Sequence, residues 1–288
     1  MATIIEGKGV AASIREEVKA AVTGLRDSGV NPKLAVILVG EDPASVLYSR
    51  SIEKSCGAAG VEFVLFAMPE KSSEDDVIAL LQRLNTDDSI HGIMIELPLP
   101  PAMNKQKVLQ AVSPLKDVDG VHPVNRGYIL SNGEGLFPTT PQSCIEIMVR
   151  NGIEINGKHA VLVGRGETVG KPLIFMMLNQ NATVTVCHTR TRDLPGHTRL
   201  ADILISAVGK AGIITADMIK PGAVVIDAGI NSVPGGGICG DVDFVNVEKV
   251  AGVISPVPGG VGSITTSLIL KNVIKAIALQ QNENKGGK

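Results

Sequence analysis

Apolar runs of strand length alternate with helically spaced apolar positions along the first part of the chain. Valine, isoleucine and leucine recur every three or four positions over residues 10–28, which predicts a helix that ends at Gly29. Residues 33–40, KLAVILVG, form a continuous apolar run typical of a strand buried on both faces. The same alternation then predicts a helix from Pro43, a strand over 62–68, a helix over 72–85 and a strand over 91–98. Strands that alternate with helices indicate a parallel sheet with right-handed crossovers.

The alternation breaks at residues 132–141, NGEGLFPTTP, where glycine and proline gather. We expect Thr140 to cap a new helix with Pro141 at its first position. Beyond it the pattern predicts strands over 159–163, 182–187, 201–208 and 223–230, and helices over 167–179 and 264–280. We therefore predict an α/β protein of two lobes, residues 1–140 and residues 141–263.

Composition narrows the class of protein without changing this fold. The net charge of −2 favours neither nucleic acid nor an acidic membrane surface as a partner. The chain has no apolar run long enough to span a membrane and begins without an apolar signal segment, so we expect a cytoplasmic protein. The four cysteines lack the paired spacing of a zinc site, and we predict no metal.

A glycine-rich turn follows the predicted strand 159–163. Gly164, Gly166 and Gly170 have the spacing G-x-G-x-x-x-G, one residue longer than the common dinucleotide fingerprint. Glycines at such a turn let the chain bend tightly and let phosphate groups approach the backbone. A merely structural turn would use the same residues, but the position between a strand and a helix favours dinucleotide binding.

The residues after the next strand distinguish NAD from NADP. An acidic residue there would bind the ribose 2′-hydroxyl of NAD, but this chain has His188, Thr189 and Arg190. Together with Arg165 in the glycine turn, these residues suit the 2′-phosphate of NADP. A solvated basic edge is the alternative interpretation. We predict NADP as the cofactor.

Five stretches resemble the motifs of one family: PASVLY at 43–48, ELPLP at 96–100, KDVDGVHPVN at 116–125, GRGETVGKP at 164–172 and SPVPGGVGSIT at 255–265. They are similar to the methylenetetrahydrofolate dehydrogenase/cyclohydrolase family, in the same order and nearly from end to end. The resemblance implies a folate-binding first lobe and an NADP-binding Rossmann second lobe. It also implies a C-terminal helix (264–288) that joins the first lobe, and a homodimer.

The resemblance further implies a role in one-carbon folate metabolism. In that family, hydride transfer from 5,10-methylenetetrahydrofolate to NADP gives the methenyl form, and hydrolysis of the methenyl form gives 10-formyltetrahydrofolate. The folate substrate would lie between the two lobes.

Several residues receive roles from the same resemblance. Tyr48 would stack against the folate, and the Asp119 carboxylate would accept two N–H bonds from the pterin edge. The rigid loop at Pro258, Gly259 and Gly260 would border the substrate. The resemblance also adds Ile230 to the cofactor-binding residues. Two simpler interpretations stay open, since Tyr48 also fits a core stripe of its helix and Asp119 also fits a turn.

The chain departs from the family at two catalytic positions. The family has a lysine one helical turn after the tyrosine, where this chain has Ile52, and a glutamine where this chain has Glu96. Lys54 cannot take over, because a residue six positions after Tyr48 points roughly 120° away from it on a helix. We therefore expect dehydrogenase activity with weak or absent cyclohydrolase activity.

Two alternatives remain. A bifunctional enzyme would use Glu96 as a substitute acid or base, with its pKa raised by burial. A non-catalytic folate- or nucleotide-binding protein would keep the binding residues without the chemistry.

Overall fold

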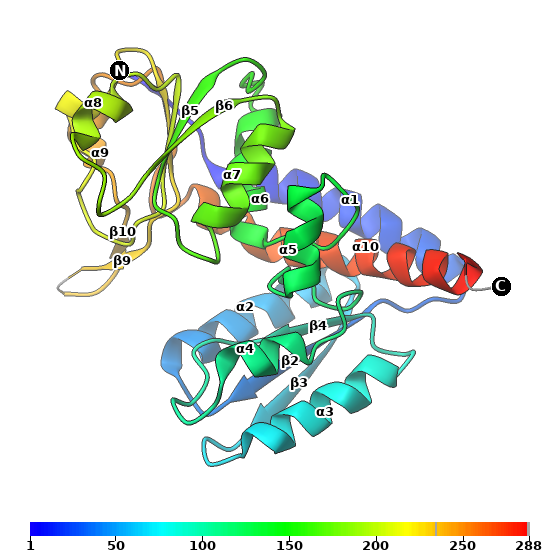
Figure 1. The fold of residues 1–288 in the computed structure, drawn as a ribbon. Coiled ribbons are helices and arrows are strands. Elements are labelled where there is room, and N and C mark those ends of the chain that lie inside the picture. Colours follow the sequence, from blue (N-terminus) through cyan, green and yellow to red (C-terminus); the bar gives the residue numbers. More distant parts are fainter. Residues whose placement is uncertain (234, 287–288) are drawn as a thin grey trace. The chain divides into compact units, whose positions relative to one another are not determined.

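The computed structural model describes residues 1–233 and 235–286 and divides the chain into two compact units (Figure 1). One unit, here called the six-stranded unit, contains Met1–Ala12 and Thr140–Thr265. The other, called the three-stranded unit, contains Ser13–Thr139 and the chain from Thr266 onward. The sequence pattern groups residues 1–12 with the residues that follow them. In the structure they belong with the six-stranded unit, because strand β1 (Thr3–Ile4) pairs with β11 (Val253–Ile254).

The three-stranded unit has a parallel sheet with the strand order β3-β2-β4. Its strands are β2 (Lys33–Val39), β3 (Glu62–Met68) and β4 (Gly92–Ile95). Its helices are α2 (Pro43–Ala59), α3 (Glu74–Thr86), α4 (Lys105–Gln110), α5 (Pro123–Leu130) and most of α1 (Gly7–Asp27) and α10 (Thr265–Gly286). The predicted parallel arrangement is confirmed for this half of the chain.

Alternate side chains of β2 point to opposite faces of this sheet. Ala35, Ile37 and Val39 lie in one buried cluster with side chains from α3 and α4, including Val77, Leu81 and Val108. The residues between them on β2 are buried as well, so both faces of the strand are covered. This burial explains the continuous apolar run, which lacks the polar alternation of a strand with one wet face.

Helix α10 is anchored to the three-stranded unit by amide side chains. Asn272 Nδ2 donates to the backbone oxygens of Val118 (2.7 Å) and Phe137 (3.0 Å). One further pair of bonds runs from Gln280 Nε2 to the oxygens of His91 and Leu115. The segment 115–118 is thereby held between β4 and α10.

The six-stranded unit has the order β1-β11-β8-β7-β5-β6, with every pairing parallel. Its longer strands are β5 (His159–Val163), β6 (Thr183–Cys187), β7 (Ile203–Ser206) and β8 (Val224–Asp227). The helices are α6 (Thr139–Arg150), α7 (Gly170–Asn179), α8 (Leu194–Thr198) and α9 (Phe244–Val247), and β9 (Asn231–Ser232) pairs with β10 (Ile238–Cys239) as a hairpin. Helices α8 and α9 pack with Val161 and Val163 on one face of the sheet, and Figure 1 shows α7 on the opposite face.

The start of α6 differs from the sequence prediction. The helix begins at Thr139, so Thr140 lies inside its first turn and does not cap it. Pro141 also falls within that turn, where its missing N–H removes no helical hydrogen bond. Among the described helices, none is both long and apolar enough to cross a membrane.

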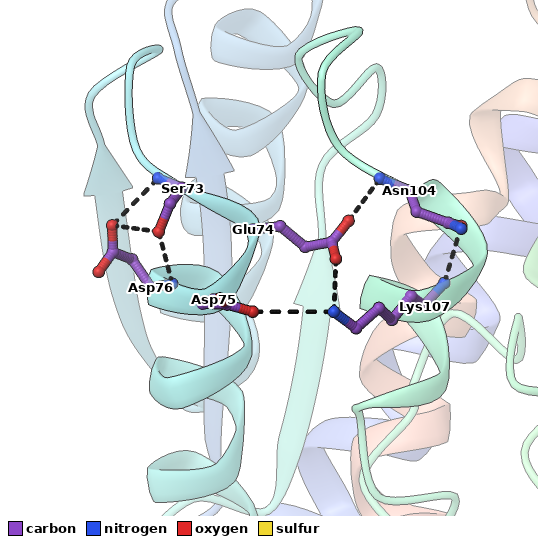
Figure 2. Close-up of polar contacts among 6 residues, drawn as sticks. All are labelled: Ser73, Glu74, Asp75, Asp76, Asn104 and Lys107. Carbon is purple, nitrogen blue, oxygen red and sulfur yellow. Dashed lines mark hydrogen bonds and ion pairs between the residues drawn. The ribbon is translucent and has the colours of Figure 1, made fainter.

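The start of α3 is stabilised by a capping box within its first turn and by contacts with the start of α4 (Figure 2). Ser73 Oγ accepts a hydrogen bond from Asp76 N (3.1 Å), and the Asp76 carboxylate accepts one from Ser73 N (3.0 Å). This reciprocal pair satisfies two backbone donors that the first turn leaves open. Glu74 accepts from Asn104 N (2.6 Å) and from Lys107 Nζ (2.7 Å), which joins the beginnings of the two helices.

We predict that Ser73→Ala lowers the free energy of unfolding by about 1 kcal/mol, because it removes the capping oxygen. Urea unfolding followed by circular dichroism measures the change. Ser72→Ala is the matched control, since Ser72 lies one residue outside the cap. Equal effects of the two substitutions would show that the cap contributes nothing measurable.

Candidate active site

One face of α2 is held against the chain that leaves β4. Asp42 caps the helix by accepting from Ser45 N (2.9 Å). Ser45 Oγ donates to the backbone oxygen of Leu97 (3.0 Å), and Ser49 Oγ, one turn later, donates to Glu96 Oε1 (2.9 Å). Two serines on successive turns therefore fix the position of Glu96 and the residue after it.

Ile52 continues this buried face. The buried residues of α2 are Ser45, Ser49, Ile52, Cys56 and Ala59, and Ile52 has no exposed surface. Tyr48 is half-buried beside this stripe, and Lys54 is exposed. The helix therefore turns Lys54 away from the face that holds Ile52, as the angular argument predicts.

Glu96 is a buried carboxyl group at the end of β4. Its backbone N–H donates to Ile37 O (2.9 Å), which extends the sheet by one residue. The residue is 3% exposed, and burial raises the pKa of its carboxyl to about 7, although the hydrogen bond from Ser49 acts in the opposite direction. Glu96 therefore carries a proton for part of the time at neutral pH.

Asp119 reaches the same edge of the sheet by a second path. The segment 116–118 runs parallel to β4, with Ile93 N donating to Lys116 O (2.6 Å) and a bridge between Ile93 and Asp117. Parallel segments end at the same edge of a sheet, so the residues that follow them meet there. This geometry brings Asp119 within electrostatic range of Glu96.

The pKa of Asp119 is raised to about 7, first by burial and then by the carboxylates of Asp117 and Glu96. The hydroxyl of Thr139 and the positive charge of Arg126 act in the opposite direction. The Arg126 side chain comes from α5, and its Nε is buried without a hydrogen-bond partner among the described residues. The edge therefore gathers three acidic groups, and one of them, Asp119, lies within electrostatic range of an arginine.

Asp117 has a structural position. Its carboxylate accepts hydrogen bonds from Val121 N (3.2 Å), His122 N (2.8 Å) and Asn125 Nδ2 (2.9 Å). His122 caps α5, with its Nδ1 accepting from Val124 N (3.1 Å). Asp117 and His122 thus form the turn that presents Asp119.

In the glycine turn after β5, two of the three glycines lie too close to neighbouring backbone atoms to carry a side chain. Gly164 has a φ of 119°, and a Cβ on it would collide with the backbone of Ala207. A Cβ on Gly170 would lie 2.7 Å from the Cα of Arg165, whereas one on Gly166 would meet nothing within 4 Å. The turn therefore combines two close contacts with one open position.

Helix α7 begins at this turn without a side-chain cap. Its first backbone N–H groups and the positive end of its dipole are a suitable site for a phosphate group. The residues present here fit the phosphates of a dinucleotide.

The predicted 2′-phosphate residues follow the ends of two neighbouring strands. β5 pairs with β6, with Val163 opposite Cys187, so the residues after each strand emerge at one edge. Arg165, Thr189 and Arg190 are exposed there. His188 is half-buried, and its Nδ1 accepts from Arg190 N (3.1 Å).

Two buried aspartates shape the neighbouring loops, and the sequence analysis did not identify them. Asp241 accepts hydrogen bonds from the backbone N–H groups of residues 208–210 and from Asn231 Nδ2 (3.0 Å). Asp227 accepts from the backbone of Gly229, Asp241 and Val242, and burial raises its pKa to about 6. These bonds fix the loop that presents Ile230, which is 63% exposed. The one signal in the sequence is an aspartate at the end of an apolar strand.

The loop at Pro258, Gly259 and Gly260 belongs to the six-stranded unit. Gly259 has a φ of 106°, and its carbonyl oxygen accepts from Gly7 N (2.7 Å). Pro258 and Gly259 are exposed and Gly260 is buried. A Cβ on Gly260 would collide with the carbonyl oxygen of Pro256, which explains the glycine there.

The raised pKa of Glu96 predicts a pH-dependent stability. The folded protein holds this proton up to about pH 7, whereas the unfolded chain releases it near 4.5, so folding binds a proton between these values. The free energy of unfolding should therefore fall as pH rises through that window, by about 3 kcal/mol from Glu96 alone.

Glu96→Gln should remove that part of the fall, which urea unfolding at a series of pH values measures. Glu53→Gln, an exposed change on α2, should leave the pH profile as in the wild type. Identical profiles for Glu96→Gln and the wild type would contradict the assignment.

Comparisons with known proteins agree with this arrangement. Residues 5–119 match the catalytic domain of the family "Tetrahydrofolate dehydrogenase/cyclohydrolase", and residues 138–281 match its NAD(P)-binding domain. The chain is 75% identical to "Bifunctional protein FolD" of Pelotomaculum thermopropionicum, over 97% of this chain and 99% of that protein.

Solved structures show the same fold. The bifunctional FolD enzyme of Campylobacter jejuni is 41% identical, with a TM-score of 0.95 over 97% of this chain and all of that chain. The Trypanosoma brucei FolD enzyme, solved with NADP and an inhibitor, is 35% identical with a TM-score of 0.90, over 97% of this chain and 98% of that one. These matches confirm the predicted fold class and support NADP as the cofactor. The chain belongs to the tetrahydrofolate dehydrogenase/cyclohydrolase family of one-carbon folate metabolism.

Proposed function

We propose that this protein is an NADP-dependent methylenetetrahydrofolate dehydrogenase whose methenyltetrahydrofolate cyclohydrolase activity is weak or absent. The observation that carries the proposal is Ile52, a fully buried apolar side chain at the position of the family's lysine. The polar neighbours that α2 provides on this face are Ser45 and Ser49, and both donate hydrogen bonds to the segment 96–97.

The dehydrogenase reaction requires no proton transfer from these side chains. NADP, when bound, accepts the hydride, and no proton has to move in that step. Gly164, Gly166 and Gly170 with the start of α7 would hold its phosphates, and Arg165 and Arg190 its 2′-phosphate. Tyr48 and Asp119 would orient the folate, so that its reacting ring is aligned with the nicotinamide ring.

The hydrolysis reaction, in contrast, requires proton transfer. Water must be activated, a tetrahedral adduct must form, and a ring nitrogen must take up a proton. General acid–base catalysis typically contributes on the order of 10²–10⁴-fold to such a step. An isoleucine side chain can neither accept nor donate a proton, so position 52 contributes none of this factor.

A second candidate function is a bifunctional enzyme in which Glu96 serves as the acid or base. The observation in its favour is the pKa of about 7, which suits proton transfer at neutral pH. A non-catalytic folate-binding protein is a third possibility, and the formation of NADPH from methylenetetrahydrofolate would eliminate it. The family resemblance also supports a homodimer.

We predict that the wild-type protein reduces NADP with methylenetetrahydrofolate but hydrolyses methenyltetrahydrofolate little faster than buffer does. Ile52→Lys should gain hydrolysis, and Ile52→Lys with Glu96→Gln should gain more, because Glu96 would hold a new ammonium group charged and weaken it as a base. Absorbance assays for each half-reaction measure both activities.

Ile52→Met is the matched control, since it provides a long side chain without a charge. It should keep hydride transfer and gain no hydrolysis. Brisk hydrolysis by the unmodified protein, abolished by Glu96→Gln, would establish the bifunctional alternative instead.

We predict that Arg165→Ala weakens binding of NADP at least about tenfold more than binding of NAD, because a guanidinium group pairs with the 2′-phosphate that NAD lacks. Titration with each cofactor measures the two affinities. Lys171→Ala is the control, as this exposed residue of α7 pairs with Glu167. An equal loss for both cofactors in Arg165→Ala would contradict the assignment.

A further inference from the structure

We propose that Glu96 is a catalytic residue of the dehydrogenase reaction, whose carboxylate stabilises the positive charge that forms on the one-carbon bridge of the folate. This inference rests on the proposed function and adds a role for the residue that replaces the family's glutamine. It also makes the site selective for a folate with a cationic bridge.

The reaction creates a cation without moving a proton. A C–H bond of the methylene carbon breaks, and both of its electrons leave with the hydrogen for the nicotinamide ring. The carbon becomes electron-deficient, and the two bridging nitrogens share the positive charge as an amidinium group. A fixed negative charge close to this bridge lowers the energy of the transition state, because charge develops there as the hydride leaves.

Glu96 has the properties that such a role requires. The residue is only 3% exposed, so water screens its charge weakly. Ser49 binds Oε1, and no ion pair with Glu96 occurs among the described residues. Ionisation of a buried carboxyl group is unfavourable when no cation lies beside it, and this cost raises the pKa of Glu96. A bound cation would offset the cost.

The surrounding groups leave this charge uncompensated. Asp119 and Asp117, on the segment beside β4, are acidic, and Tyr48 is the half-buried phenol of α2. The positive charge of Arg126, from α5, acts on Asp119. Ile52 adds no charge on the buried face of α2. A lysine at position 52 would compensate the negative charge of Glu96. With isoleucine there, that charge stays available to a cationic ligand.

This role differs from that of a hydrolytic base. An electrostatic role requires an ionised Glu96 in the complex with the cation, and the cation in turn favours ionisation. A hydrolytic base acts only after the methenyl cation has formed, so its removal would lower hydrolysis and leave hydride transfer unchanged. The two roles therefore predict different effects of Glu96→Gln on the kcat of hydride transfer.

The test compares two ligands that differ at the bridge. Binding of 5,10-methenyltetrahydrofolate, which is cationic there, and of tetrahydrofolate, which is not, is measured by rapid mixing at about pH 8, where Glu96 is ionised. Glu96→Gln should weaken the cationic ligand at least about tenfold and tetrahydrofolate less than about twofold. The kcat of hydride transfer should fall by about the same factor as the affinity for the cationic ligand. KM for methylenetetrahydrofolate should change little.

Two control variants complete the design. Asp119→Asn should weaken both ligands to a similar extent, because its proposed bond is to the pterin edge that they share. Glu53→Gln, exposed on α2, should change neither. Equal weakening of both ligands by Glu96→Gln, or no weakening, would overturn the inference while leaving the dehydrogenase assignment in place. A wild-type protein that binds neither ligand would overturn the proposed function, and this inference with it.

Discussion

The hydrogen bond from Ser49 to Glu96 is the contact on which the proposed chemistry depends. It joins a buried carboxyl group at the end of β4 to the buried face of α2, and the Ser45 contact one turn earlier fixes the same segment. The segment 116–118 runs parallel to β4 and delivers Asp119 to the same edge. Two carboxyl groups with pKa values of about 7 thus lie within electrostatic range of each other, and Glu96 is bonded to the buried face of α2.

In the function proposed here, this arrangement favours hydride transfer over hydrolysis. A negative environment stabilises a cation that forms by hydride loss, and it does so without any proton transfer. On the same proposal, the negative environment stabilises the methenyl cation, and Ile52 supplies no group that could activate water. On this proposal, Ile52 and Glu96 act together to set the charge of the site.

Much of this structure follows from the sequence, for identifiable reasons. The strand over 62–68 is assigned with its observed bounds, because the apolar run lies between clear turn signals. The motif around Asp119 and the glycine turn could also be identified, since each has a distinctive order of residues. Short elements such as β1 and β11 could not, because two residues carry no periodicity and their pairing joins distant segments.

The contacts of the site were less predictable than its residues. Nothing local to Ser49 indicates that it bonds Glu96, 47 positions away, because the contact arises from the packing of α2 on the sheet. The buried pair Asp227 and Asp241 was missed for the same reason: the carboxylates bind backbone groups of loops that only the fold brings together. A raised pKa of Glu96 entered the sequence analysis only within one alternative, and that of Asp119 did not enter it, because a sequence does not specify burial at a strand end.

The central claim is that this site forms the methenyl cation and does not hydrolyse it. A single-turnover experiment tests it most directly, with protein and NADP in excess over methylenetetrahydrofolate and the products separated after quenching. The account predicts that nearly all of the folate leaves as methenyltetrahydrofolate, with 10-formyltetrahydrofolate appearing at the rate of the uncatalysed reaction. Release of most of the folate as 10-formyltetrahydrofolate within the turnover would contradict it.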